Sequence, residues 1–168
     1  MKQGIIIAGF TALGKTTLAQ KYDNIIDLES SLYQWKYKNK MTLEEIETNK
    51  GKKERIPNDK FPENYIKAIL EARKKYDIVL TSMHWKLLEY FNKNNISFYL
   101  AYPKLDSGDV LKQRCIDRGN TEELAQAIKD KVNLWYPRIR EYNIKNVIFI
   151  DKNECLENAL IKMNLIKE

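Results

Sequence analysis

The sequence is poor in the residues that bind metals or form disulfides, with two cysteines and one histidine among 168 residues. Cys115 and Cys155 belong to no CxxC pair, so neither a disulfide framework nor a zinc site is expected, and both are predicted to be reduced packing residues. No apolar run approaches the roughly 20 residues of a membrane span, and the one at the N-terminus is too short for a signal peptide. We therefore expect a cytoplasmic protein with no membrane partner.

Glycine and proline are also scarce, at six and four residues, and no linker or low-complexity segment interrupts the chain. Hydrophobic residues at 43% and charged residues at 31% are ordinary globular values, which excludes a disordered or fibrous chain. The length fits one domain spanning residues 1–168. The net charge of +6 favours polyanionic partners, either nucleic acid or phosphorylated small molecules, without choosing between them.

Short apolar runs rich in β-branched residues alternate with stretches of helical period, which predicts an α/β fold. The predicted strands cover residues 5–8, 24–28, 77–81, 96–100 and 146–150, and the predicted helices cover about 15–22, 62–75, 86–93, 107–118, 121–142 and 154–163. Continuous rather than alternating apolar runs indicate a parallel sheet flanked by helices on both sides. Ligands of such sheets bind beyond the carboxyl ends of the strands.

A glycine-rich motif lies between the first predicted strand and the first predicted helix. The segment Gly9-Phe10-Thr11-Ala12-Leu13-Gly14-Lys15-Thr16 matches G-x-x-x-x-G-K-[ST], in which backbone N–H groups cradle phosphate. Lys15 would supply a positive charge for the β- and γ-phosphates, and the Thr16 hydroxyl would ligate Mg²⁺. The expected nucleotide-binding residues are Gly9, Thr11, Ala12, Leu13, Gly14, Lys15, Thr16 and Thr17.

With this motif the chain resembles the P-loop kinases, in particular the small nucleoside and nucleotide kinase-like group that includes adenylate kinase and shikimate kinase. The resemblance implies a three-layer P-loop NTPase fold with a five-stranded parallel sheet in the order 2-3-1-4-5. It also implies ATP and Mg²⁺ as co-substrates, an acceptor-side insertion at about residues 33–60 and a lid at about 104–120. The stretch F-P-x-N-Y at residues 61–65 is similar to one in phage and firmicute P-loop proteins.

Two acids end the second predicted strand, where strand alternation sends Asp27 and Glu29 to the same side. In the small-molecule kinases that the chain resembles, one acid of such a pair holds Mg²⁺ through water and the other receives the acceptor hydroxyl. Asp27 is then the catalytic acid on the metal side, together with Thr16, and Glu29 is the acceptor-side acid or general base. Alternatively, Asp27 and Ser30 merely cap the next helix. The third strand carries no carboxylate at its end, because its acid, Asp77, precedes the apolar run.

Arg114 and Arg118 are the predicted lid arginines. Their spacing of four places them on one helix face, and Gly119 offers a helix stop directly afterwards. The pattern R-x-x-x-R-G resembles the short lid of small P-loop kinases, whose arginines stabilise charge on the transferring phosphoryl group. A solvated face of charged residues is the alternative.

Further candidate contacts for the acceptor are scattered along the chain: Arg55, Phe61, Asn64, Tyr65, His84 and Arg138. Phe61, Asn64 and Tyr65 are predicted to form an aromatic platform with an amide that reads a base. Alternatively, Phe61 and Tyr65 pack together at a helix that starts near Pro62. For His84 and Arg138, a structural role is the alternative.

The expected function is an ATP- and Mg²⁺-dependent phosphotransferase that moves the γ-phosphoryl group to a nucleoside, a nucleotide or another small acceptor. A polynucleotide 5′-end kinase is one alternative, suggested by the net charge and the basic residues 50–55, although no second nucleic-acid-binding module favours it. A non-catalytic ATP-binding sensor or regulatory protein is the other, suggested by the third strand. The acceptor and the oligomeric state stay open.

Overall fold

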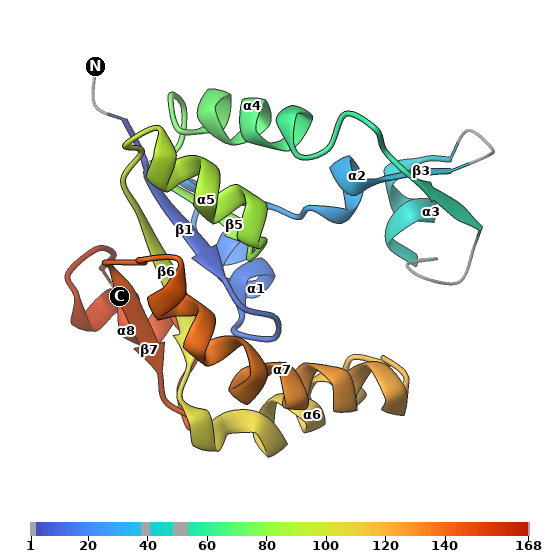
Figure 1. The fold of residues 1–168 in the computed structure, drawn as a ribbon, viewed down its shortest axis with the longest axis vertical. Helices are drawn as coiled ribbons and strands as arrows, with labels where there is room; N and C mark the ends of the chain where they lie inside the picture. Colours follow the sequence, from blue (N-terminus) through green and yellow to red (C-terminus); the bar gives the residue numbers. More distant parts are fainter. Residues whose placement is uncertain (1–2, 38–40, 49–53, 168) are drawn as a thin grey trace.

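Five parallel strands form the central sheet of the computed structural model, which describes residues 3–37, 41–48 and 54–167 (Figure 1). The strands are β1 (Ile5–Gly9), β2 (Ile25–Leu28), β5 (Ile78–Ser82), β6 (Phe98–Pro103) and β7 (Val147–Ile150). Each overlaps one predicted strand, so the prediction of an α/β fold with a parallel sheet is confirmed. Their order across the sheet is β2-β5-β1-β6-β7.

A second, antiparallel sheet that the sequence did not predict consists of β3 (Trp35–Tyr37) and β4 (Arg55–Pro57). It lies in the expected insertion, together with α2 (Ser31–Gln34) and α3 (Leu43–Thr48). Strands of three residues are too short for their side-chain alternation to be recognised. The labels also count β3 and β4, so the labelled order differs from the expected 2-3-1-4-5. When only the five parallel strands are numbered, in chain order, their order across the sheet is 2-3-1-4-5.

Helices cover both faces of the parallel sheet. On one face, α1 (Lys15–Lys21) contacts α8 (Leu156–Lys162), and Lys21 forms an ion pair with Glu157 at 2.5 Å. On the other face, α5 (Trp85–Lys93) meets α7 (Glu122–Glu141) where the rings of Trp85 and Trp135 lie 5.8 Å apart. The right-handed crossover rule places α4 (Glu63–Ala72) on the same face as α5.

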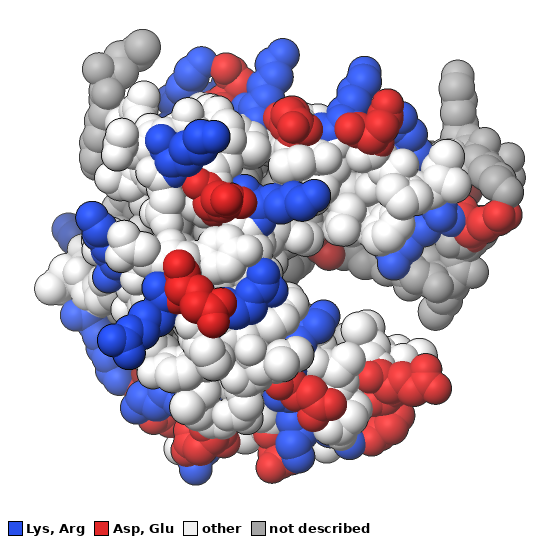
Figure 2. Space-filling model, in the orientation of Figure 1, with Lys and Arg blue, Asp and Glu red and all other residues white. Residues whose placement is uncertain are grey.

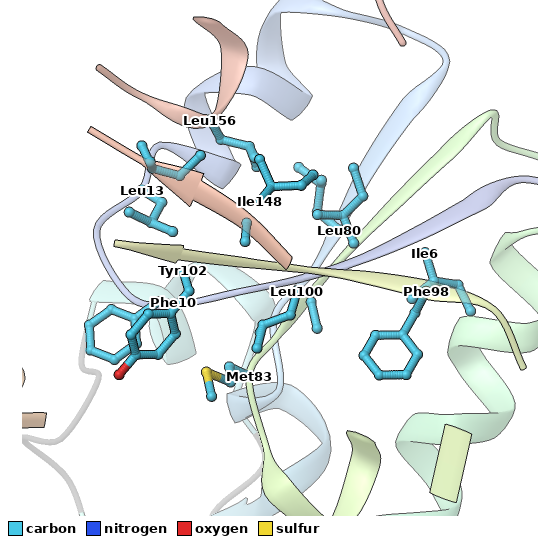
Figure 3. Close-up of a cluster of buried hydrophobic side chains, with 14 of the residues drawn as sticks. Ile6, Phe10, Leu13, Leu80, Met83, Phe98, Leu100, Tyr102, Ile148 and Leu156 are labelled. Carbon is cyan, nitrogen blue, oxygen red and sulfur yellow. The ribbon is translucent and has the colours of Figure 1, made fainter. Parts of the chain in front are cut away.

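The core lies on both sides of β1, the central strand, in which Ile6, Ile7 and Ala8 have no exposed surface. Figure 3 shows this arrangement around the sheet. Phe98, Leu100 and Tyr102 of β6 face the α5 and α7 side, whereas Leu80 and Ile148 lie on the opposite side with Leu13 and Leu156. Burial on both faces explains why most residues of these strands are apolar.

A pair of helices extends beyond the sheet after β6. The short 3₁₀ helix η1 (Leu105–Ser107) leads into α6 (Gly108–Asp117), which packs along α7. The predicted stop after α6 is confirmed, because Gly119 has a φ of 84°, a conformation that glycine adopts without strain. Thr121 caps α7 by accepting a hydrogen bond from the Leu124 N–H at 3.3 Å. No helix within the described residues combines the length and apolar character needed to cross a membrane.

Candidate functional site

A cleft opens beside the carboxyl edge of the parallel sheet. Figure 2 shows the surface hollowed between the region of α2 to β4 and the α6–α7 pair. In Figure 1 the loop that joins β1 to α1 lies between these two projections. Because all five strands run in the same direction, the residues that follow β1, β2 and β5 meet at this edge.

Residues 9–16, called here the glycine loop, curl because two of their residues adopt positive φ angles. Ala12 has a φ of 63° and Gly14 a φ of 91°. Such left-handed residues turn successive backbone N–H groups towards one side, which creates an anion-binding concavity called a nest. Gly9 also leaves room for Lys15, since a Cβ at position 9 would lie 2.9 Å from the Lys15 Cδ. Gly14 therefore suits its left-handed conformation, and Gly9 leaves the space that the Lys15 side chain occupies.

The Lys15 side chain folds back over the glycine loop. Its Nζ donates hydrogen bonds to the carbonyl oxygens of Gly9 at 3.0 Å and Phe10 at 2.9 Å. Burial lowers the pKa of Lys15 below its ordinary value; the carboxylates of Asp27 and Glu29 act in the opposite direction, and Arg118 lowers it further. These three charged side chains therefore lie near the ammonium group.

Asp27 lies directly beside the glycine loop. Its Oδ2 accepts a hydrogen bond from the Thr16 hydroxyl at 2.9 Å, which joins the end of β2 to the start of α1. The alternative of helix capping is not observed, because the Ser30 side chain makes no capping bond at α2. Asp77 lies at the opposite end of β5, where it accepts a hydrogen bond from the Asn24 amide at 2.9 Å.

The two predicted lid arginines lie in different surroundings. Arg114 donates to the carbonyl oxygens of Ala12 at 3.3 Å and Glu154 at 3.1 Å, and so ties the glycine loop to the segment between β7 and α8. Arg118 follows α6, is exposed, and acts electrostatically on Lys15. Arg114 therefore bonds backbone carbonyls in this structure, whereas Arg118 is exposed near Lys15, and a contact of either arginine with a phosphate stays a prediction.

The residues of the predicted base-reading platform contact other groups of the protein, and base reading by them stays a prediction. The Asn64 amide donates to the Tyr33 carbonyl at 3.0 Å and accepts from the Tyr65 N–H at 2.8 Å, so both ends are in use. Tyr65 is fully buried, and its hydroxyl donates to the Leu28 carbonyl and accepts from the Ser82 N–H at 2.9 Å. Tyr65 therefore joins the ends of β2 and β5. Packing at the helix start is confirmed, with the rings of Phe61 and Tyr65 stacked 6.0 Å apart.

His84 follows β5 and stands at the start of α5. Its Nε2 is 2.8 Å from the Ser30 hydroxyl, and its ring meets the half-buried Phe61 edge to face at 5.3 Å. Burial lowers the pKa of His84, and Lys131 on α7 lowers it further. The imidazole is therefore neutral at pH 7 and holds the segments after β2 and β5 together.

Arg55 and Arg138, the remaining predicted contacts, both stack on aromatic rings. The Arg55 guanidinium lies 4.2 Å from the Trp35 ring, between β4 and β3. The Arg138 guanidinium lies 4.5 Å from the Trp85 ring and donates to the Tyr142 hydroxyl at 3.1 Å. The alternative of a packing role therefore describes Arg138. Of the basic residues 50–55, residues 50–53 lie outside the described part of the chain.

Two residues of α7 that the sequence analysis did not select also reach this region. Trp135 contacts Phe10 of the glycine loop, with ring centroids 5.9 Å apart. The Lys131 ammonium lies 5.0 Å from the Trp135 ring and acts electrostatically on His84. Their spacing of one helical turn was the available signal, but only the packing of α7 against the sheet shows which face turns inward.

Protein side chains alone form no metal site in the part of the chain that the structure describes. Within the described residues, no group of three or more His, Cys, Asp or Glu could hold an ion. The neighbouring Thr16 hydroxyl and Asp27 carboxylate nevertheless offer hard oxygen atoms, which Mg²⁺ prefers in combination with phosphate oxygens and water. These residues therefore fit a magnesium ion that arrives with a nucleotide. Cys115 and Cys155 are both free thiols, as expected.

Comparison with known proteins identifies a similar fold and assigns no activity. No protein-family model matches the chain, and no curated protein matches it. Among solved structures, the chain is similar to the crystal structure of an uncharacterized protein from Eubacterium ventriosum ATCC 27560. The two chains are 14% identical, and the similarity covers 98% of this chain and 97% of the other, with a TM-score of 0.50. At this identity the similarity concerns the fold alone.

Proposed function

We propose that the chain is a P-loop phosphotransferase that moves the γ-phosphoryl group of ATP to a small acceptor. The observation that carries the proposal is the glycine loop: a strand, a curled loop with two positive φ angles, and a lysine folded over the loop beside two carboxylates. This combination suits a triphosphate, because backbone N–H groups and one ammonium share its negative charge. In this proposal the sheet is a P-loop NTPase fold.

The donor nucleotide binds with its phosphates in the nest of the glycine loop. Lys15 exchanges its carbonyl partners, Gly9 and Phe10, for phosphate oxygens, which are stronger hydrogen-bond acceptors. Thr16 and Asp27 hold Mg²⁺, which neutralises phosphate charge when bound. Arg114 keeps the glycine loop in place through its carbonyl bonds, and Arg118 adds a cation near the transferring group.

The acceptor binds in the cleft between β2 and α7. Glu29, which lies near Lys15, receives the proton of the acceptor hydroxyl. Phe61 contacts His84, and Lys131, which lies against Trp135 on α7, acts electrostatically on His84; in this proposal these four residues contact the acceptor. These residues fit an acceptor with an apolar or aromatic part, in keeping with a nucleoside, a nucleotide or another small hydroxyl compound.

The test is Mg²⁺-dependent release of ADP from ATP in the presence of a panel of acceptors. The panel contains nucleosides, nucleoside monophosphates, oligonucleotide 5′ ends and cyclic polyols that carry a carboxylate. One acceptor should raise turnover to the order of 1–100 s⁻¹. Lys15→Ala should abolish that turnover while the circular dichroism spectrum stays unchanged. Lys67→Ala, which removes an exposed lysine from α4, should keep full turnover and serves as the matched control.

The other outcomes separate the alternative functions. ATP binding without turnover across the panel would replace the kinase with an ATP-binding sensor. Turnover only with oligonucleotide 5′ ends, with an affinity that falls steeply with salt, would indicate a polynucleotide kinase, because neutralised phosphates release counterions. Wild-type turnover in Lys15→Ala would contradict the mechanism itself.

A further inference from the structure

Phe10 is the apolar residue directly after Gly9 in the glycine loop. Its side chain is buried, although the cradling of phosphate by backbone N–H groups does not depend on this side chain. Its carbonyl oxygen accepts a hydrogen bond from the Lys15 ammonium at 2.9 Å, and its N–H donates to the Ala101 carbonyl of β6 at 3.0 Å. The position of Phe10 therefore affects both the shape of the loop and the place of the Lys15 ammonium.

Two aromatic side chains contact the Phe10 ring. The ring of Tyr102, on β6, lies beside it with centroids 5.2 Å apart and an interplanar angle of 69° (Figure 3). The ring of Trp135, on α7, lies 5.9 Å away at an angle of 79°. Both are edge-to-face arrangements, which aromatic pairs prefer. Tyr102 belongs to the sheet that also carries the loop, whereas Trp135 connects the loop to α7.

Trp135 is itself held by a second tryptophan. The Trp85 ring, at the start of α5, lies 5.8 Å from the Trp135 ring at an angle of 75°. The Trp85 ring in turn has the Tyr142 ring at 4.9 Å and the Arg138 guanidinium at 4.5 Å. A side chain can position another one only when packing fixes its own rotamer. These contacts give Trp135 that support.

Arg114, on α6, provides a second contact between the helix pair and the glycine loop. It donates to the Ala12 carbonyl at 3.3 Å, two residues after Phe10. Because α6 and α7 pack along each other, Arg114 and Trp135 act on the loop from one packed pair. The hydrogen bond restrains a carbonyl, whereas the ring contact restrains a side chain and the peptide that carries it. The shape of the glycine loop therefore depends on this helix pair as well as on the sheet.

We propose that Trp135 is a positioning residue for the donor nucleotide and acts through Phe10. The inference rests on the proposed function, because it requires that the glycine loop binds the phosphates of ATP. The Trp135 ring keeps the Phe10 side chain in place, and the Phe10 peptide keeps the neighbouring N–H groups directed at the phosphates. Without the Trp135 ring, the loop has to be ordered at the moment of binding. This loss of preorganisation weakens binding although no group that touches the phosphates is removed.

The first test is the dissociation constant of MgATP, measured by isothermal titration calorimetry without an acceptor. Contact of Trp135 with an acceptor then does not enter the result. Trp135→Leu should weaken binding about 3- to 10-fold, which corresponds to the loss of one aromatic pair. Trp135→Phe keeps an aromatic ring and should bind within about twofold of the wild type.

Phe91→Leu is the matched control for a loss of packing alone. Phe91 is buried on α5, and its ring lies 5.4 Å from that of Phe98, which begins β6 at the edge of the sheet opposite the glycine loop. Phe91→Leu and Trp135→Leu should both lower the thermal midpoint of unfolding. Only Trp135→Leu should raise the dissociation constant of MgATP.

A double-mutant cycle tests whether Trp135 acts through Phe10. Phe10→Leu should weaken MgATP binding by a similar factor. Adding Trp135→Leu to it should have little further effect, because the ring that Trp135 positions is already gone. If the two factors multiply instead, Trp135 acts on the nucleotide by another route and the proposal is overturned.

Tryptophan fluorescence gives a readout that a merely structural role of Trp135 would not change. MgATP should alter the emission of the three tryptophans, because Lys15 leaves the Phe10 carbonyl beside the Trp135 ring. Trp135→Phe should remove most of this change. Trp35→Phe, which alters the β3–β4 pair, should keep it.

The outcomes separate this inference from the proposed function. A wild type that does not bind MgATP would contradict both. A wild type that binds MgATP, together with an unchanged dissociation constant in Trp135→Leu or an unchanged fluorescence response in Trp135→Phe, would overturn the inference alone. If Trp135→Leu does not fold, the fluorescence comparison of Trp135→Phe with Trp35→Phe decides.

Discussion

The Thr16 hydroxyl donates a hydrogen bond to the Asp27 carboxylate at 2.9 Å. The two residues belong to different elements, α1 and β2, and the bond places a hard oxygen pair at the mouth of the glycine loop. In the proposed function, these two oxygen-bearing side chains hold the Mg²⁺ ion.

Substitution of either partner should therefore reduce activity much more than stability. Asp27→Asn and Thr16→Ala should each lower turnover by about 10²–10³-fold, because charge on the phosphates is less well neutralised. Thr16→Ser keeps the hydroxyl and should retain most of the activity. Turnover measured as a function of Mg²⁺ concentration checks this, and Asp27→Asn with an unchanged Mg²⁺ requirement would remove Asp27 from the metal side.

Arg114 and Arg118 should have separable roles. Arg114→Ala removes the donor for the Ala12 and Glu154 carbonyls, so it should lower the free energy of unfolding by about 1–3 kcal/mol and weaken nucleotide binding. Arg118→Ala changes an exposed side chain and should leave stability within about 0.5 kcal/mol while lowering turnover. Urea unfolding and ATP titration of both variants provide the comparison. Equal effects of the two substitutions on unfolding would show that the assignment is wrong.

The hydroxyl of Tyr65 should matter for stability. Tyr65→Phe leaves the Ser82 N–H and the Leu28 carbonyl without their shared partner inside the protein. The loss should be about 1–3 kcal/mol in the free energy of unfolding. Tyr90→Phe, at a residue that is 37% exposed on α5, is the matched control and should change stability little. Chemical denaturation measures both, and a Tyr65→Phe variant as stable as the control would contradict the bridging role.

His84 should make stability depend on pH below its ordinary pKa of 6.5. Burial, followed by the effect of Lys131, lowers the pKa of His84 in the folded chain, so the unfolded chain binds a proton first as the pH falls. Folding stability therefore decreases below pH 6.5, by at most about 1.4 kcal/mol per pH unit.

The measurement is unfolding at about pH 7.5 and about pH 5.5 for the wild type and His84→Gln. Because His84 is the only histidine, the difference between the two proteins isolates its contribution. Lys131→Gln should raise the pKa of His84, which NMR titration of the imidazole can follow. An identical pH dependence in the wild type and His84→Gln would rule out the buried neutral state.

The parallel sheet was predictable because most residues of its strands form apolar runs, as in Ile5–Gly9 and Val147–Ile150. The glycine loop was predictable because its backbone conformation requires Gly9, Gly14 and Lys15 at a fixed spacing, and this spacing can be recognised in the sequence. The β3–β4 pair was not, since three-residue strands have no detectable period and Trp35 stacks on Arg55 from a distant part of the chain.

Side-chain roles in the candidate site were harder to predict, because they depend on contacts between distant segments. Tyr65 reaches Leu28 and Ser82, and Arg114 reaches Ala12 and Glu154; neither partner set lies near its donor in the sequence. A tyrosine or an arginine beside a glycine loop suggests contact with a ligand. In this structure Tyr65 and Arg114 form hydrogen bonds with backbone groups instead. Lys131 and Trp135 were missed because the inward face of α7 depends on packing.

The central position of β1 also affects when the chain can fold during synthesis. β1 pairs with β5 and β6, so this strand has no neighbour until Ser82 has been made and lacks the second until Pro103 has been made. Pairing over such sequence separations is entropically costly and slow. The apolar segment 5–8 consequently remains unpaired until β5 has been made, and the nascent chain should depend on chaperones during that interval more than the finished protein does.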